Sequence, residues 1–219
     1  MKRKLFKLLF ATVCLLGSTN TFAYDVNVKN ADGVTIYYNY TNNGTELEVV
    51  SGDSYNKYTG SVVIPETVTI LNKTRKVTGI GSEAFRYCGY LTSITIPASV
   101  TSIGEYAFHY CSGLKKVIVK DLAAWCGISF FDRYSNPLYY AKHLYSDEDT
   151  EITDLVIPEG VTSIGDYAFY YCSSLTSVTI PGSVTSIGDY AFSDCSGLTS
   201  VIIPGSVTSI GDGAFRGCI

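Results

Sequence analysis

A 23-residue unit recurs along this chain and constrains its fold more than any other feature. Ile-Gly pairs begin at Ile80, Ile103, Ile164, Ile187 and Ile210, and a phenylalanine follows each isoleucine by five residues. Successive pairs are 23, 61, 23 and 23 residues apart, so one regular array is interrupted once. Fixed periods of this length are typical of solenoids, whose coils bury apolar faces only against neighbouring coils. We therefore expect a repeat solenoid over 61–219, with an insertion at about 120–151.

Each unit divides into two halves with different patterns. In the unit that starts at Leu175, apolar residues alternate with hydroxyl residues up to Pro181, which predicts a half-buried strand that ends at the proline. In the second half, Gly188 permits a sharp bend, and Asp189 is placed to open a short helical turn. The apolar residues after Asp189 are expected to face the core.

The spacing L-x-x-V-x-I-P, followed by V-T-S-I-G-x-x-A-F-x-x-C, resembles the BspA-like leucine-rich repeats of bacterial surface proteins. The resemblance runs from about Tyr58 to the C-terminus, apart from the insertion. It implies a leucine-rich-repeat arc with a parallel sheet on its inner face and short helical turns outside. It also implies a role in adhesion or in binding to other macromolecules, without naming the ligand.

Residues 24–60 precede the repeats and predict an N-terminal β cap, because a solenoid must cover its open end. Alternating residues from Gly33 to Val50 surround Asn43-Gly44, which is a strong hairpin signal. A second hairpin tip is expected at Leu71–Lys76, inside the unusually long first unit.

The first 23 residues combine a basic start, an apolar run from Leu8 to Leu16 and a small-residue cleavage pattern ending at Ala23. This pattern predicts a secretory signal peptide and an exported protein, at the cell surface or secreted. Its removal would make the formal net charge of −4 more acidic. Acidic chains are poor candidates for binding nucleic acid or anionic membranes, and no later segment is long enough to span a membrane.

Five cysteines share one repeat position: Cys88, Cys111, Cys172, Cys195 and Cys218. Export favours disulfides in general. However, equivalent side chains on adjacent coils point in parallel about 5 Å apart, whereas a disulfide needs facing Cβ atoms roughly 3.8 Å apart. The register therefore predicts a ladder of free, buried thiols.

Two groups of residues are candidates for ligand binding. The outward strand positions form a predicted concave face, consisting of Ser93, Thr95, Lys116, Ile118, Asp154, Val156, Ser177, Thr179, Ser200 and Ile202. The insertion supplies aromatic anchors, namely Trp125, Phe130, Phe131, Tyr139 and Tyr140. The alternatives are that the strand residues only suit a solvated pleated surface, and that most of the rings bury one another.

Catalytic, metal-binding and cofactor-binding patterns do not emerge from the sequence. Cys126, His143 and Asn136 lack the flanking motif of a cysteine protease. The acids between Asp147 and Asp154 lack the ligand order of a calcium loop. We therefore expect a non-enzymatic protein, without metal or cofactor, that binds an extracellular or cell-surface protein. A carbohydrate-binding module is the alternative.

The sequence stops at Gly217-Cys218-Ile219 without a capping repeat, which predicts either truncation or end-to-end self-association.

Overall fold

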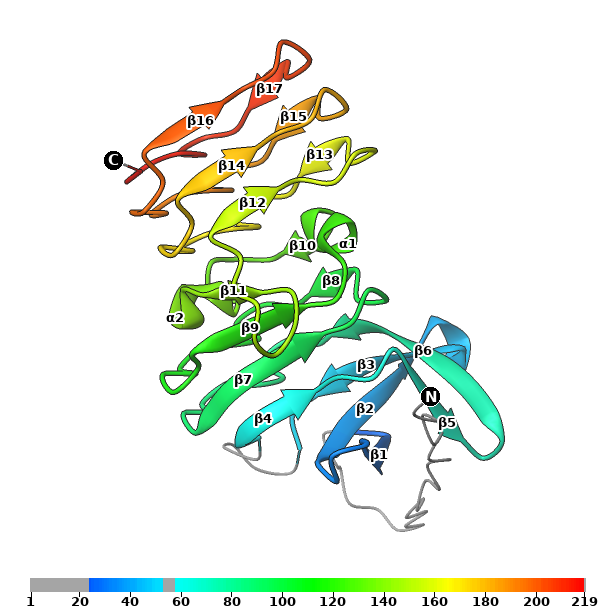
Figure 1. Ribbon diagram of the computed structural model, residues 1–219. Coiled ribbons are helices and arrows are strands. Elements are labelled where there is room, and N and C mark those ends of the chain that lie inside the picture. Colours follow the sequence, from blue (N-terminus) through cyan, green and yellow to red (C-terminus); the bar gives the residue numbers. More distant parts are fainter. Residues whose placement is uncertain (1–23, 53–57, 219) are drawn as a thin grey trace, which may run out of the picture.

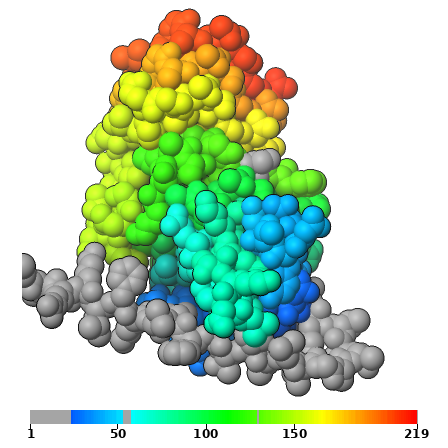
Figure 2. All heavy atoms as spheres, turned by 90° about the vertical axis from the view of Figure 1, so that its right-hand side faces the viewer, coloured from blue at the N-terminus to red at the C-terminus, as the bar shows by residue number. Residues whose placement is uncertain are grey.

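The computed structural model describes residues 24–52 and 58–218 of the chain. These residues form a stack of coils in which each coil lies on the one before it (Figure 1). A space-filling view from the side shows the coils as successive bands along the molecule (Figure 2). The predicted signal peptide, 1–23, lies outside the described residues. The repeat solenoid expected from the 23-residue period is the architecture of this part of the chain.

Two ladders of parallel strands run along the stack, because each regular coil contributes two strands. The first ladder consists of β4 (Gly60–Val63), β7 (Leu91–Ile96), β9 (Lys116–Val119) and β11 (Leu144–Tyr145), then, after a break, β12 (Asp154–Val156), β14 (Ser177–Thr179) and β16 (Ser200–Ile202). The second consists of β6 (Lys73–Ile80), β8 (Ser102–Ile103) and β10 (Ser129–Phe130), then, after a break, β13 (Ser163–Ile164), β15 (Ser186–Ile187) and β17 (Ser209–Ile210). Equivalent residues stand opposite one another, as Val178 does between Leu155 and Val201. The parallel sheet expected from the resemblance is thus accompanied by a second parallel ladder.

The N-terminal strands extend the second ladder with antiparallel pairs. Strand β2 (Thr35–Thr41) pairs with both β1 (Val26–Lys29) and β3 (Glu46–Val50), and a short 3-10 turn η1 (Asn42–Gly44) connects β2 to β3. Strand β3 then pairs in parallel with β6, while β5 (Thr67–Ile70) forms an antiparallel hairpin with β6. The tip of that hairpin projects beyond the stack (Figure 1).

The prediction of a short helical turn in each repeat is wrong, because left-handed residues interrupt the backbone there. In the coil after β15, Tyr190 has a φ of 54° and Asp194 a φ of 59°. The backbone instead makes successive four-residue turns, such as the one closed by the bond from Ser193 N–H to Tyr190 C=O at 3.1 Å. An α-helix needs consecutive right-handed residues, so this alternation excludes one.

The core is a set of columns, each made by one repeat position. Phenylalanine rings stack from coil to coil, with centroids 4.9 Å apart for Phe85 and Phe108 and 5.1 Å apart for Phe169 and Phe192. All four rings are fully buried. The cysteines form a neighbouring column, and those in the described part of the chain are not joined by disulfides, as the register predicts. The Sγ of Cys195 lies 3.1 Å from the carbonyl oxygen of Phe169 in the preceding coil. Core packing and these weak hydrogen bonds therefore act between adjacent coils.

The expected insertion at about 120–151 needs a correction, because much of it is another coil. Its helix α1 (Leu122–Cys126) begins at Asp121, whose side chain accepts a hydrogen bond from Ala124 N–H at 3.0 Å. Strand β10 then pairs in parallel with β8, which places Phe130 opposite Ile103. After α2 (Leu138–Ala141), strand β11 pairs in parallel with β9. This coil keeps the ladders while its sequence departs from the motif.

Antiparallel pairing within 142–157 is confined to a short segment around 144–152. One antiparallel bridge joins Tyr145 to Glu151, and the chain then enters β12, which pairs in parallel with β14. Both ladders break at this junction. The two parts are joined by other contacts: Trp125 Nε1 donates to Ala168 C=O at 2.9 Å, and Asn136 Nδ2 donates to Tyr167 C=O at 2.6 Å. Side-chain bonds, together with the backbone bond from Gly165 N–H to Cys126 C=O at 2.9 Å, therefore join the two parts where strand pairing stops.

Candidate functional site

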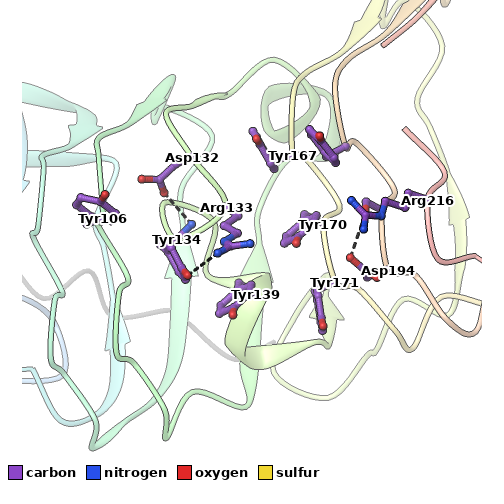
Figure 3. Close-up of a pocket in the computed structure, with 12 residues that line it drawn as sticks. Tyr106, Asp132, Arg133, Tyr134, Tyr139, Tyr167, Tyr170, Tyr171, Asp194 and Arg216 are labelled. Atoms are coloured by element: carbon purple, nitrogen blue, oxygen red, sulfur yellow. Dashed lines mark hydrogen bonds between the residues drawn. The ribbon is translucent and has the colours of Figure 1, made fainter. Parts of the chain in front are cut away.

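A pocket of about 480 Å³ lies on the face of the solenoid formed by the turns, across the junction between its two parts. Figure 3 shows side chains from both parts converging on it. Seven of the twelve lining residues are tyrosines. The lining residues are Tyr106, Asp132, Arg133, Tyr134, Tyr139, Tyr167, Tyr170, Tyr171, Tyr190, Ser193, Asp194 and Arg216.

The left-handed turn positions supply several of these side chains. Tyr106, Tyr167, Tyr171 and Tyr190 have φ values between 53° and 63°. A left-handed conformation costs a bulky residue roughly 1–2 kcal/mol. The same two turn positions in the last coil carry Gly213 and Gly217, with φ values of 61° and 74°. The backbone thus accepts glycine where four of the pocket tyrosines stand.

The tyrosine rings contact one another across the junction. The rings of Tyr139 and Tyr170 are nearly parallel, at an interplanar angle of 3° with centroids 6.1 Å apart. Tyr167 stacks on Tyr190 at 5.3 Å. Edge contacts complete the cluster, such as Tyr139 against Tyr171 at 5.4 Å. Because these rings come from different coils, the pocket depends on their stacking in register.

Two aspartates and two arginines line the pocket, and both aspartates accept hydrogen bonds from neighbouring residues. One oxygen of Asp132 accepts hydrogen bonds from Tyr134 N–H and Ser135 N–H, both at 2.7 Å. The Oδ2 of Asp194 accepts from the hydroxyl of Ser193 at 3.0 Å. The backbone N–H of Asp194 donates to the C=O of Arg216 at 2.6 Å.

Hydrogen bonding and burial keep the donors of the pocket protonated. The bond from Arg133 Nη2 to the Tyr134 hydroxyl, 2.8 Å long, is the main cause of a raised pKa for Arg133. Burial raises the pKa of the Tyr139, Tyr167 and Tyr170 hydroxyls. These groups therefore remain hydrogen-bond donors at neutral and mildly alkaline pH.

His109 lies beside the pocket, packed against its aromatic wall. Its ring is 4.3 Å from that of Tyr134 and 4.0 Å from that of Tyr110, and its buried Nδ1 has no hydrogen-bond partner. Burial, followed by the nearby Arg86, lowers the pKa of His109. Tyr170 and Ser193, at the equivalent repeat position, are buried. The side chain at this repeat position is therefore packed against the neighbouring tyrosine rings and does not face open solvent.

Comparison with known families agrees with this architecture. The family model described as the BspA type leucine rich repeat region matches residues 78–136 and 142–219, in six copies. The chain belongs to the BspA-type leucine-rich-repeat family. The match includes most of the 120–151 segment, where β10 and β11 continue the ladders. The resemblance identified from the repeat spacing is thus confirmed.

Several solved structures are similar to this BspA-type chain. A leucine rich cell surface protein from Faecalibacterium prausnitzii is 28% identical, with a TM-score of 0.54, covering 89% of this chain and 52% of that protein. A T. pallidum leucine rich repeat protein is 26% identical (TM-score 0.40, 84% and 64% covered). A leucine-rich repeat protein from Bacteroides ovatus is 25% identical (TM-score 0.42, 81% and 54% covered). The chain thus spans about half the length of the Faecalibacterium protein. No curated protein matches the chain.

The predicted concave face of this BspA-type chain is not uniformly exposed. Ser93, Thr95 and Ile118 are buried, so their prediction as outward binding residues is wrong. Lys116 is half-buried, with its ammonium donating to Glu148 C=O and lying 4.6 Å from the Tyr145 ring centroid. The loop after β11 passes over this part of the sheet (Figure 1), which a strand pattern alone does not reveal.

The second half of the same face remains accessible. Val156 and Ile202 are 61% and 80% exposed, and Thr179 stands between them in the register. Ser200 is exposed and Ser177 half-buried. Asp154 is exposed and accepts a hydrogen bond from the Ser177 hydroxyl at 2.6 Å. The structure therefore leaves five of the predicted face residues exposed: Asp154, Val156, Thr179, Ser200 and Ile202.

The predicted aromatic anchors separate into core and surface residues. Trp125 and Phe130 are buried and pack edge to face at 5.2 Å, so they are not available to a ligand. Phe131 is 68% exposed but does not line the pocket. Tyr139 lines it, while Tyr140 uses its hydroxyl to accept a hydrogen bond from Tyr110 N–H at 2.8 Å.

Sequence reasoning missed most of the pocket, although one signal was present. Tyr106, Tyr167 and Tyr190 follow the acid of each repeat by one residue and precede the core phenylalanine by two. A column of tyrosines beside a column of phenylalanines could have been expected from that phase. Among residues 24–52 and 58–218, no group of three or more His, Cys, Asp or Glu is placed to hold a metal. No helix in those ranges is long and apolar enough to cross a membrane.

Proposed function

We propose that this chain is an exported, non-enzymatic leucine-rich-repeat protein that binds another protein, at or outside the bacterial cell surface, and supports adhesion there. The observation that carries the proposal is the tyrosine-lined pocket across the solenoid junction. Tyrosine and arginine are enriched at protein interfaces because they combine a large apolar area with hydrogen-bond donors. The pocket contains both residue types, and its rings are held in place by one another.

Family membership supports a surface role. The Faecalibacterium relative is described as a cell surface protein, and repeat solenoids commonly bind partners on extended surfaces. The basic and apolar N-terminus supports export. Mass spectrometry of the protein from culture supernatant and cell envelope would test this, with an N-terminus at Tyr24 expected. An intact Met1 in cytosolic fractions alone would contradict export.

Binding is tested with the folded mature chain against a panel of extracellular-matrix and cell-surface proteins, by surface plasmon resonance. A partner that uses the pocket should lose affinity in Tyr190→Gly, which removes a lining ring at a position where the backbone favours glycine. Tyr110→Gly is the matched control, because Tyr110 is also left-handed but lies outside the pocket lining. Equal binding by both variants would remove the pocket from the proposal. The absence of any partner would count against protein binding.

A carbohydrate-binding function is the second candidate. It is favoured by the parallel rings of Tyr139 and Tyr170 and by half-buried Tyr171, which give the pocket several aromatic surfaces. A glycan array would test it. Saturable binding abolished by Tyr139→Ala would favour this function. Trp125→Ala is uninformative, since Trp125 is buried in the core.

The N-terminal strands are proposed to cap the solenoid. Their apolar side chains, including Ile36, Leu47 and Val49, are fully buried. Strand β3 pairs with β6 at the start of the second ladder, which supports this role. Deletion of residues 24–52 is expected to prevent soluble folding, whereas a folded, monomeric truncated protein would show that no cap is needed.

A further inference from the structure

We propose that the pocket binds a proline-rich polypeptide segment in the polyproline II conformation, lying along the axis of the solenoid. This inference rests on the proposed protein-binding function and names its partner class. The segment would cross the junction, contacting Tyr106 and Tyr134 at one end and Arg216 at the other.

The spacing of the coils that form the pocket is close to the repeat of this conformation. Equivalent rings on adjacent coils are 5.1 Å apart for Phe169 and Phe192 and 5.4 Å apart for Phe192 and Phe215. Two coil steps, about 10.5 Å, are therefore within about 1.2 Å of one polyproline II turn, which is about 9.3 Å for three residues at a rise of about 3.1 Å. An extended β-strand repeats every two residues, at about 6.7 Å, and does not match.

The hydrogen-bonding groups of the pocket also suit this ligand. A polyproline II segment has no internal hydrogen bonds, so its carbonyl oxygens need donors, and proline offers no N–H in return. The pocket supplies donors from Arg133, Arg216 and the tyrosine hydroxyls. Its acids are partly occupied by Ser193, Ser135 and backbone N–H groups. The positive donor groups are therefore complementary to the partial negative charge on the ligand's carbonyl oxygens.

The backbone shows that these tyrosine rings are not needed to form the turns. Tyr106, Tyr167, Tyr171 and Tyr190 occupy left-handed positions at which Gly213 and Gly217 stand in the last coil. Left-handed side chains also stand outside the pocket, as at Tyr110, so the support for binding is that four rings from such positions gather in one pocket. Flat rings at these positions offer the surfaces on which proline rings pack in aromatic grooves.

The test is isothermal titration calorimetry of the folded mature chain with decaproline. A Gly-Ser peptide of equal length is the flexible control, and cello- and chito-oligosaccharides form the glycan arm. Saturable one-to-one binding of decaproline is expected, with no heat from the Gly-Ser peptide. Tyr190→Gly should weaken binding by about tenfold or more, as for loss of an aromatic anchor. Tyr110→Gly should leave it unchanged. Urea denaturation of both variants would verify that they are folded.

Three outcomes would overturn the inference: no decaproline binding at millimolar concentration, equal binding by wild type and Tyr190→Gly, or saturation of the pocket by an oligosaccharide only. The failure is distinguishable from failure of the proposed function. A protein partner whose affinity depends on Tyr190, combined with no decaproline binding, would refute the polyproline ligand and retain protein binding. Absence of both would refute both proposals.

Discussion

The carboxylate of Asp166 accepts a hydrogen bond from the backbone N–H of Asp189, one coil later, with 2.7 Å between Oδ1 and N. Asp189 repeats the contact with the N–H of Asp212, also at 2.7 Å. The sequence predicts that this acid opens a helical turn in its own coil. In the structure the acid instead connects neighbouring coils, so the repeated Asp is part of the stacking interaction.

Replacing Asp189 by alanine should therefore weaken the connection between two coils. The loss of one exposed, charge-assisted hydrogen bond is expected to reduce the free energy of unfolding by about 1 kcal/mol. Urea denaturation measures this change. Asp212→Ala is the matched control, because the Asp212 carboxylate has no hydrogen bond within the described chain. Equal destabilisation by the two substitutions would show that the inter-coil bond contributes nothing.

Much of the fold follows from the repeat register alone. Val178, Ile187 and Phe192 are buried as their periodic positions predict. The coil within 120–151 could not be recognised in this way. Phe130 occupies the position of Ile103, while the parallel ladder is formed by backbone groups that any residue other than proline supplies. In this coil the sequence departs from the 23-residue motif, while the two parallel ladders continue.

The pocket was harder to predict than the fold. Intrinsic preferences assign left-handed turn positions to glycine or asparagine, so a tyrosine such as Tyr167 does not suggest a φ of 59°. The direction of its ring depends on that φ. The pocket also combines residues from 132–139 with residues of later coils, and their juxtaposition depends on how the two ladders break at the junction.

The buried thiols should make the protein less stable in alkali. Burial raises the pKa of Cys126 and Cys172 to about 12, compared with about 8.5 in an unfolded chain. Between these values the unfolded state has released a proton that the folded state retains. The stabilisation is therefore complete below about pH 8.5 and is lost as the pH rises towards 12, by roughly 1.4 kcal/mol per pH unit for each thiol.

Urea midpoints at about pH 8 and about pH 10 measure this loss. Cys172→Ala removes one of the thiols and should show a shallower decline. A midpoint that does not change over this interval would contradict the raised pKa values. In a separate measurement, a thiol reagent should modify the folded protein slowly, because the cysteines from Cys88 to Cys195 are buried.

The junction should depend strongly on Asn136. This side chain is fully buried, donates to the carbonyl oxygens of Tyr167 and Ala168, and accepts from Leu138 N–H at 2.8 Å. Asn136→Ala leaves all three backbone groups without this partner, so it should reduce the free energy of unfolding by about 2–4 kcal/mol. Thermal unfolding measures the change. Asn27→Ala, at a half-buried strand position, should change stability by less than about 0.5 kcal/mol. Similar effects of the two substitutions would contradict the role of Asn136.

The left-handed tyrosines make a prediction that inverts the usual ranking of alanine and glycine. Both Tyr190→Gly and Tyr190→Ala remove the ring that stacks on Tyr167, but only glycine relieves the strain of a φ of 54°. Tyr190→Gly should therefore be more stable than Tyr190→Ala by about 1 kcal/mol in urea denaturation. Ser196 is exposed and not left-handed, so there the alanine variant should be at least as stable as the glycine variant. If alanine were also preferred at Tyr190, the turn would not hold this residue in the left-handed region. The argument that its ring is retained for binding would then lose its energetic basis.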